Sequence, residues 1–287
     1  FFRIQDHLVC IAANLVDMGG LTNYWYLYNE KEASYDFISR LTGARLTSSF
    51  TRIGGMYRDF YEGWENDLEK QLKDIERGVD DSLKLVLKNR IVHDRTQGIC
   101  ILPKETALSY GYTGPCLRAS GVPYDLRKDA PYYHYDLFDF DVPVGTTGDL
   151  YDRLMIRFEE IFQSIKIIRQ AVKMIPGGPI FVDNPLVCLP PKSNVYNNIE
   201  DLANHFKLIF DGVKAPAGEW YDSYEAANGE LGFHIVSDGS GRPYKVKVRP
   251  PCFYIMSGFH EMVEGSMIAD VVINLGSINI IGGELDR

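Results

Sequence analysis

Apolar side chains recur every three or four residues near the start of the chain, which is the pattern of a helix with one buried face. This stripe consists of Ile4, Leu8, Ile11, Leu15 and Met18. A polar stripe runs beside it and consists of Arg3, His7, Cys10, Asn14 and Asp17. Two such stripes, about 100° apart, indicate a helix that packs on one side and faces a polar cavity or a subunit interface on the other.

The same periodicity predicts further helices, whose limits are set by glycine and proline. They are expected at about residues 23–41, 67–87, 104–110, 149–175 and 198–210. The helix at 149–175 has the clearest pattern, and we expect Thr146 or Thr147 to cap its start. Residues 50–60 are predicted to form a loop in which Gly54 and Gly55 permit a close backbone approach.

The period changes near the end of the chain. Residues 231–248 alternate apolar and polar side chains on both sides of a Gly/Asp/Pro turn, which predicts a β-hairpin. A short helix is expected at about 261–275. Together, the expected helices and the hairpin indicate a mainly α fold with a small β element (α+β), in a single domain that covers residues 1–287. Its helical core covers about 1–215, and the hairpin, C-terminal helix and tail cover about 216–287.

Composition and charge narrow the possible functions. The net charge of −9 argues against a nucleic-acid binder, because such proteins neutralise phosphates with clustered Lys and Arg. The five cysteines are odd in number and contain no Cys-x-x-Cys pair. This spacing favours a reducing compartment over a disulfide framework, and it supports no iron–sulfur, zinc or other metal site within the chain itself.

No apolar run approaches the roughly 20 residues that cross a bilayer, so we expect any membrane association to go through a partner. The chain begins without Met and with residues that are already helical in pattern, so we expect a longer protein to have been cut at this point.

Two groups of residues could carry chemistry, and each has a structural alternative. Arg3, His7 and Asp17 fit an interhelical ion network, or a cavity wall that passes protons to a substrate. Arg45, Arg52 and Arg58 fit exposed loop positions, or a surface that holds a partner's redox centre. The segment 117–145 is dense in aromatic and acidic residues, which is typical of a binding or interface loop.

Five long blocks, in order, resemble the quinone-site subunit of respiratory complex I. They are LTGARLTSSFTRIGGMYRDFYEGW, GYTGPCLRASGVPYDLRKDAPY, FDVPVGTTGDLYDR, GELGFHIVSDGSGRPYKVKVRPP and ADVVINLGSINIIGGELDR. The resemblance implies a helical bundle of the nickel–iron hydrogenase large-subunit type, here without its N-terminal part. Those hydrogenases hold nickel with two Cys-x-x-Cys pairs, which this chain lacks, so a nickel site is not expected.

The resemblance also implies a place in a larger enzyme. The subunit would form the quinone-reduction site of a proton-translocating NADH:quinone oxidoreductase, beside the terminal [4Fe-4S] cluster of a small partner subunit, and would not act alone. Quinone would be its substrate, while NAD would be used on another chain. The quinone would enter from a membrane-arm subunit. The chain would sit peripherally on the cytoplasmic side of the cell membrane, or on the matrix side if mitochondrial.

Several residues match the family's site. Asp17 corresponds to the aspartate that pairs with a headgroup-binding histidine, a residue expected in the N-terminal part. We therefore expect Asp17, with His7 on the same stripe, to be catalytic. Two tail residues, Asp286 and Arg287, correspond to the end of the pocket lining. Arg45 and Arg52 fall in the block that faces the cluster.

Thr47 departs from the family, because many mitochondrial-type relatives have a histidine at this position beside the cluster. A neutral residue there should lower the cluster potential and weaken its pH dependence. We therefore hypothesise a low-potential quinone such as menaquinone.

Two alternatives stay open from the sequence. One is an equivalent scaffold or quinone-site subunit in a related complex fed by ferredoxin or coenzyme F420. The other is a hydrogen-activating subunit, which the missing cysteine pairs oppose.

Overall fold

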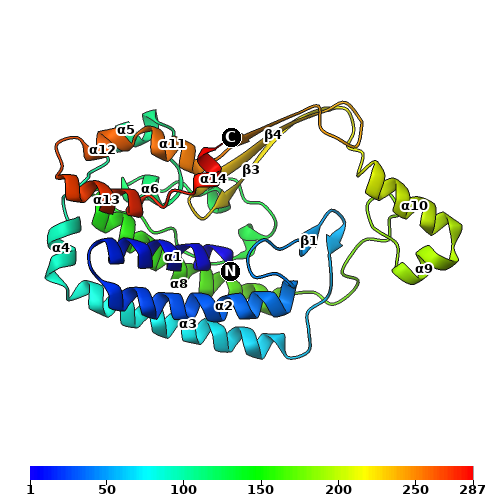
Figure 1. The fold of residues 1–287 in the computed structure, drawn as a ribbon, viewed down its shortest axis with the longest axis horizontal. Helices are drawn as coiled ribbons and strands as arrows, with labels where there is room; N and C mark the ends of the chain where they lie inside the picture. Colours follow the sequence, from blue (N-terminus) through cyan, green and yellow to red (C-terminus); the bar gives the residue numbers. More distant parts are fainter. Residues whose placement is uncertain (287) are drawn as a thin grey trace.

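Four long helices lie side by side in the computed structural model, which describes residues 1–286 (Figure 1). They are α1 (Phe2–Asp17), α2 (Leu21–Thr42), α3 (Trp64–Leu87) and α8 (Leu150–Met174). Their apolar stripes meet in the larger hydrophobic core, where Leu8, Leu72, Ile75 and Ile161 are almost completely buried. Helices α1, α3 and α8 were expected from their periodicity, and α2 from the glycines at its ends.

The ends of these helices follow from local chemistry. Gly43 adopts φ 85° after α2, and its N–H bonds to the carbonyl oxygen of Ser39. The start of α8 differs from the prediction of a threonine cap. Asp149 is the cap and accepts from the Asp152 N–H at 2.8 Å. The N–H groups of Thr146 and Thr147 instead donate to the Asp152 carboxylate, at 2.9 and 2.7 Å.

Short helices surround a second hydrophobic core beside α8. It includes Leu102, Tyr112, Ile255 and Ile273, which are nearly inaccessible to solvent. The short helices that contribute to it are α5 (Lys104–Ser109), α6 (Gly114–Ala119), α11 (Pro251–Ser257), α12 (Phe259–Val263) and α13 (Ile268–Ser277). The other short helices are α4 (Arg90–Thr96), α7 (Leu126–Asp129), the 3-10 helix η1 (Tyr135–Leu137) and α14 (Gly282–Leu285). The single helix expected at 261–275 is wrong, because Gly265, with φ 78°, lies between α12 and α13.

A three-stranded antiparallel sheet projects from the body as an arm (Figure 1). Its strands are β3 (Gly218–Ala226), β4 (Gly229–Ser237) and β5 (Lys245–Arg249), in that order. The predicted hairpin is confirmed as β4 and β5. Strand β3 was not predicted, because it is mostly exposed and shows no apolar alternation.

The predicted loop at 50–60 contains a small hairpin, β1 (Thr51–Arg52) and β2 (Gly55–Met56). Its backbone approaches residues 180–182 closely, as expected from the two glycines: the Met56 N–H bonds to the Ile180 carbonyl at 2.9 Å, and a Cβ on Gly55 would lie 2.2 Å from that oxygen.

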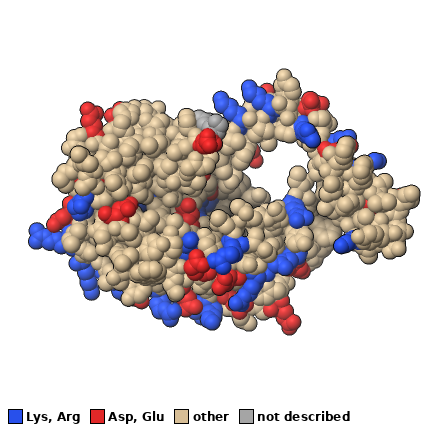
Figure 2. Space-filling view, viewed as in Figure 1, with Lys and Arg blue, Asp and Glu red and all other residues tan. Residues whose placement is uncertain are grey.

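Two helices lie away from the body, at the far end of the arm (Figure 1). They are α9 (Lys192–Asn197) and α10 (Ile199–Phe210), and neither contains a buried residue. Figure 2 shows an opening between this lobe, the sheet arm and the body. The whole is a mixed helical fold with small sheets, compatible with the α+β class. Within residues 1–286, no helix has both the length and the apolar character needed to cross a membrane.

Candidate functional site

Two polar stripes pack against each other between α1 and α8. The stripe on α8 consists of Arg153, Arg157, Glu160 and Ser164, which follow at helical spacing and are all buried. The stripe on α1 is the one read from the sequence, and its members from His7 to Asn14 are buried as well. Buried charges have to be paired, so the partners of these residues determine what the stripes can do.

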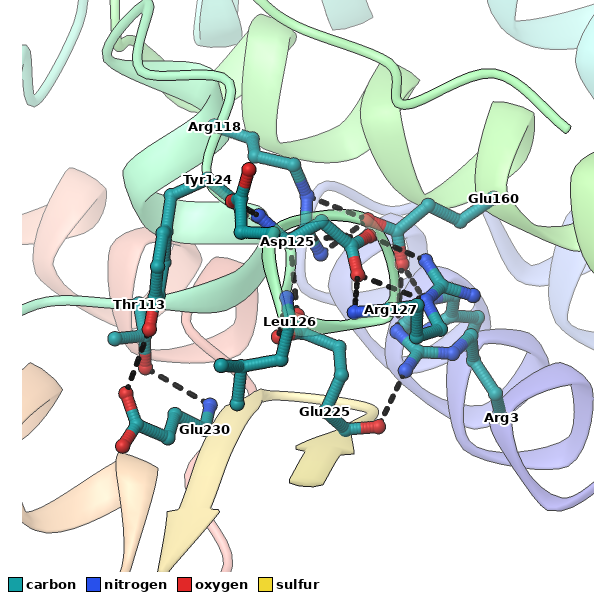
Figure 3. Close-up of polar contacts among 12 residues, drawn as sticks. Arg3, Thr113, Arg118, Tyr124, Asp125, Leu126, Arg127, Glu160, Glu225 and Glu230 are labelled. Carbon is teal, nitrogen blue, oxygen red and sulfur yellow. Dashed lines mark hydrogen bonds and ion pairs between the residues drawn. The ribbon is translucent and has the colours of Figure 1, made fainter. Parts of the chain in front are cut away.

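Glu160 is the centre of a buried ion network (Figure 3). One carboxylate oxygen accepts from Arg118, at 3.1 Å from Nε and 2.6 Å from Nη2. The other lies 2.7 Å from Nε2 of His7 and 3.2 Å from Nη1 of Arg3. The network therefore joins α1, α6 and α8, which are far apart in the sequence.

The same arginine connects Glu160 to the sheet. Nη1 of Arg118 donates to the Glu225 carboxylate at 2.9 Å and lies 3.6 Å from Asp125 (Figure 3). Asp125 is held by two bonds from Arg127, at 2.9 and 2.6 Å. The side chains of Arg118, Asp125, Arg127 and Glu225 are almost inaccessible to solvent. This is therefore a closed internal structure rather than an open binding surface.

The network keeps the carboxyl groups of Glu160 and Asp125 ionised. Burial alone would raise the pKa of Glu160, but the charge of Arg118 and the bond to His7 hold it well below the ordinary value. The same opposition applies to Asp125, where Arg127 and Arg118 overcome the effect of burial and lower the pKa. The arginines therefore keep these two carboxylates negatively charged in the protein interior.

His7 is fully buried, and both of its ring nitrogens lie near carboxylates. Nε2 faces Glu160 at 2.7 Å, and Nδ1 lies 3.3 Å from Asp6. Of the two readings of the stripe, the interhelical ion network describes Arg3 and His7. A direct contact between His7 and a substrate would require one of these bonds to break.

Asp17 lies outside this network, at the other end of α1. Ten residues separate it from His7, which is about 15 Å along the helix axis. Its carboxylate is exposed and packs against Gly276 of α13, where an added Cβ would lie 2.8 Å from Oδ2. Partial burial raises the pKa of Asp17. Among residues 1–286 it has no hydrogen-bond or ion-pair partner, so the structure does not bring Asp17 and His7 together.

A second buried arginine fixes α13 next to Asp17. Arg153 donates to the side chains of Ser277 and Asn274 at 3.1 and 3.0 Å, and to the Cys100 carbonyl at 2.8 Å. Burial lowers the pKa of Arg153. These bonds set the position of α13, and therefore of the surface on which the Asp17 carboxylate lies.

The tail residue Asp286 is exposed and follows α14. The segment before it is tied to the first half of α1, because the Asn279 amide donates to Asp6 at 2.8 Å. Asp286 is therefore connected to the His7 end of α1 rather than to the Asp17 end. Arg287 lies outside the described residues.

The residues expected to face the cluster share one exposed segment between α2 and β2. Arg45 is paired with Glu32 at 2.6 Å. The Arg52 guanidinium lies 4.4 Å from the Tyr57 ring centre, and its Nε donates to a backbone carbonyl. Thr47 lies between them in the sequence and is exposed. The structure thus places all three on a surface that a partner can reach. Within the described part of the chain, no group of three or more His, Cys, Asp or Glu side chains is arranged to hold a metal.

Comparison with known proteins identifies the family. Residues 17–287 match the family model described as the 49 kDa subunit of the respiratory-chain NADH dehydrogenase. The chain belongs to this family.

Relatives match almost the whole chain. The C/D-type NADH-quinone oxidoreductase subunit of Bdellovibrio bacteriovorus is 50% identical over 285 residues, covering 99% of this chain and 51% of the relative. The D-type subunit of Myxococcus xanthus is 49% identical, with 99% and 69% covered. The D-type subunit of Leptospira biflexa is 46% identical, with 99% and 70% covered. The chain thus spans about half of the first relative and about 70% of the others.

The sequence analysis did not single out the central residues of the network in this 49 kDa-family chain, namely Arg118, Glu160 and Glu225. A signal existed on α8, where a charged stripe runs beside the apolar one at the same spacing as on α1. The segment 117–145 was read as a binding loop, but it supplies Arg118, Asp125 and Arg127 to the interior. Which acid each arginine meets depends on tertiary contacts that the sequence does not display.

Proposed function

We propose that the chain forms the quinone-reduction site of a membrane-associated, proton-translocating NADH:quinone oxidoreductase and acts only within that complex. The observation that carries this proposal is the 46–50% identity, over 99% of the chain, to NADH-quinone oxidoreductase subunits of the D and C/D types. The names of these relatives favour NADH over ferredoxin or F420 as the electron source. They also favour quinone as the substrate.

Quinone takes up two electrons and two protons to become quinol, so the site needs an electron source and a proton source. In this proposal NADH is oxidised on another chain, and its electrons reach the terminal [4Fe-4S] cluster of a small partner subunit. The exposed cations Arg45 and Arg52 face that cluster and favour its reduced state electrostatically. Thr47 adds no titrating group beside the cluster, so the cluster potential should be low. A low cluster potential suits a low-potential quinone such as menaquinone.

Asp17 is the group that we assign to proton handling. Its carboxylate is unpaired within residues 1–286, borders solvent and has a raised pKa, which are properties expected of a functional acid. It would adjust the protonation of the headgroup-binding histidine implied by the resemblance. His7, the other residue that we expect to be catalytic, would act through its bond to Glu160 in the buried network. The resemblance implies that Asp286 and Arg287 belong to the end of the pocket lining.

The charge change on quinone reduction would then pass toward the membrane arm. The partners in this proposal are the small [4Fe-4S]-carrying subunit and the membrane-arm subunit through which quinone enters. The chain would be peripheral, on the cytoplasmic side of the cell membrane or the matrix side in a mitochondrion. Its helical bundle would be of the nickel–iron hydrogenase large-subunit type.

The proposal is tested by purifying the complex from native membranes through a tag on this chain. NADH oxidation is then followed with and without added quinone, and with a quinone-site inhibitor. We expect oxidation that depends on quinone and stops with the inhibitor. A complex that contains the chain but oxidises reduced ferredoxin or F420 instead of NADH would overturn the assignment of the donor.

A further inference from the structure

Helix α10 carries an apolar stripe that residues 1–286 leave uncovered. Its members are between 49% and 81% exposed and follow at helical spacing: Ile199, Leu202, Phe206, Ile209 and Phe210. A helix of 12 residues is marginal in water without packing of its apolar face. A stripe of this kind indicates a surface that is covered in the assembled protein.

A cavity of about 670 Å³ opens beside this stripe, between α10, the segment before α9 and the β1–β2 hairpin. Its walls are largely apolar and include Ile53, Met56, Phe181, Val187, Leu189 and Ile209. A depression of this size admits several large side chains. Ile209 belongs to both the stripe and the cavity wall, so the two adjoin at this residue.

The charged side chains that line the cavity have one sign. Arg52 and Lys192 are the charged residues that line the cavity, and both are cations. Neither has a carboxylate partner within residues 1–286, although the chain as a whole has a net charge of −9. Figure 2 shows basic side chains around the opening between the sheet arm, the lobe and the body. The occupant of this surface should therefore be acidic as well as apolar.

We propose that this surface, formed by α10 and the Arg52–Lys192 cavity, docks an acidic amphipathic segment of another protein. The apolar side chains of that segment enter the cavity and lie along the α10 stripe, and its carboxylates meet Arg52 and Lys192. This interface shares Arg52 with the surface proposed to face the cluster, but it does not involve Asp17, so it stands whether or not Asp17 has the role proposed above.

Two other occupants fit the observations less well. An anionic membrane surface would favour a Lys/Arg-rich polar face on α10, whereas that helix carries Glu200 and Asp201 in its first turn. A second copy of this chain, related by a two-fold axis, would bring the same cations close together. An acidic protein segment avoids both conflicts, because its carboxylates can meet the cavity cations while its apolar side chains, rather than its acids, lie along α10.

The test uses the assembled complex, with the photoreactive residue p-benzoylphenylalanine in place of Ile209. The matched control carries it in place of Ile91, which is 61% exposed on α4, compared with 65% for Ile209. Mass spectrometry identifies the crosslinked product. We expect Ile209 to give a partner peptide that contains apolar residues and at least two carboxylates, and Ile91 not to give it. A lipid product, a second copy of this chain, a neutral or basic peptide, or no product would overturn the proposal.

Charge variants then test the electrostatic part. Lys192→Glu should lower the crosslink yield about fivefold, which is the effect of losing one exposed ion pair and is not expected for Lys192→Arg. Exchanging the crosslinked carboxylate for lysine should restore the yield in the Lys192→Glu background. If Lys192→Glu prevents assembly, Lys192→Gln carries the test with an expected loss of about twofold. An unchanged yield in the neutral or reversed variant contradicts the proposal. NADH oxidation by an artificial acceptor reports the integrity of each complex independently.

Discussion

Nε2 of His7 lies 2.7 Å from a carboxylate oxygen of Glu160, and both side chains are at most 1% exposed. The two residues are 153 positions apart in the sequence, so this contact joins α1 to α8 in the interior. Arg118 and Arg3 bind the same carboxylate, so Glu160 connects α8 to both α1 and α6. The network thus holds the His7 end of α1 against α8, while Asp17 lies at the other end of the same helix.

Glu160→Gln should destabilise the full chain by about 3–5 kcal/mol, because it removes one carboxylate from the buried network and leaves the charge of Arg118 only partly neutralised, by Glu225 and Asp125. Denaturant unfolding of the purified chain measures this loss. Glu76→Gln is the matched control. Glu76 also binds an arginine, Arg169, but both side chains are about one third exposed, so a loss of about 1 kcal/mol or less is expected. Equal effects of the two changes would contradict the central role of Glu160.

The pH dependence of unfolding follows from the lowered pKa of Glu160. A depressed folded-state pKa contributes stability that is fully present above the ordinary glutamate value of about 4.3 and is lost as pH falls through the folded-state value. Wild-type stability should therefore fall below about pH 4, and Glu160→Gln should show a shallower fall. Parallel profiles for the two proteins would show that Glu160 does not contribute to acid unfolding.

Asp17→Asn should lower quinone reduction by about 10- to 100-fold while NADH oxidation by an artificial acceptor is unchanged. The pH profile separates this role from a structural one. Partial burial raises the pKa of Asp17, so the wild-type activity should fall on acidification at a higher pH than an ordinary aspartate would give. The variant should lose that dependence. Asp81→Asn, on the exposed face of α3, is the control, and loss of both activities in Asp17→Asn would indicate failed assembly.

Thr47→His should make the partner's cluster potential depend on pH. A histidine with a pKa near 6.5 is protonated more strongly when the neighbouring cluster is reduced, so the midpoint potential should fall by up to about 59 mV per pH unit near neutrality. The wild-type complex, with neutral Thr47, should show a flatter dependence. A redox titration of the cluster at several pH values measures both, and a steep wild-type dependence would remove the argument for a low-potential quinone.

Gly114→Ala should destabilise the chain by several times the effect of Gly98→Ala. The two glycines have nearly the same φ, 67° and 68°, so the backbone strain is similar and about 1 kcal/mol. They differ in their surroundings: a Cβ on Gly114 would lie 2.4 Å from the Asn228 carbonyl oxygen, whereas nothing lies within 4 Å of one on Gly98. The denaturant midpoints of the two variants measure their losses of stability, and equal losses would argue against the close packing of α6 on β4.

Periodicity predicted α1, α3 and α8 well, because these helices bury a regular apolar stripe over many turns. Helix α2 was expected from its glycine limits instead, and it buries Asn23, Glu30 and Ser34 beside its apolar side chains. Periodicity did not predict α6 or α7, which are four to six residues long and depend on contacts made elsewhere. Strand β3 was not predicted for a related reason. Its residues are mostly exposed, so hydrogen bonding to β4 rather than burial defines it.

The candidate site was predicted unevenly for physical reasons. The polar stripe on α1 was visible in the sequence. Helix α8 covers the His7 end of this stripe but not the Asp17 end, and the spacing of the residues along α1 does not reveal this difference. Long-range partners such as Glu160 and Glu225 are set by the packing of separate elements. Arg45, Thr47 and Arg52 lie on one exposed segment, in agreement with their shared sequence block.

The central claim is that this chain holds the quinone at the Asp17 end of α1. Photolabelling the purified complex with an azidoquinone, with and without excess unlabelled quinone, tests it most directly. We predict label on the peptides of this chain that contain Asp17 and α13, and its displacement by the unlabelled quinone. Displaceable label found only on other subunits, or only on parts of this chain remote from Asp17, would contradict the account.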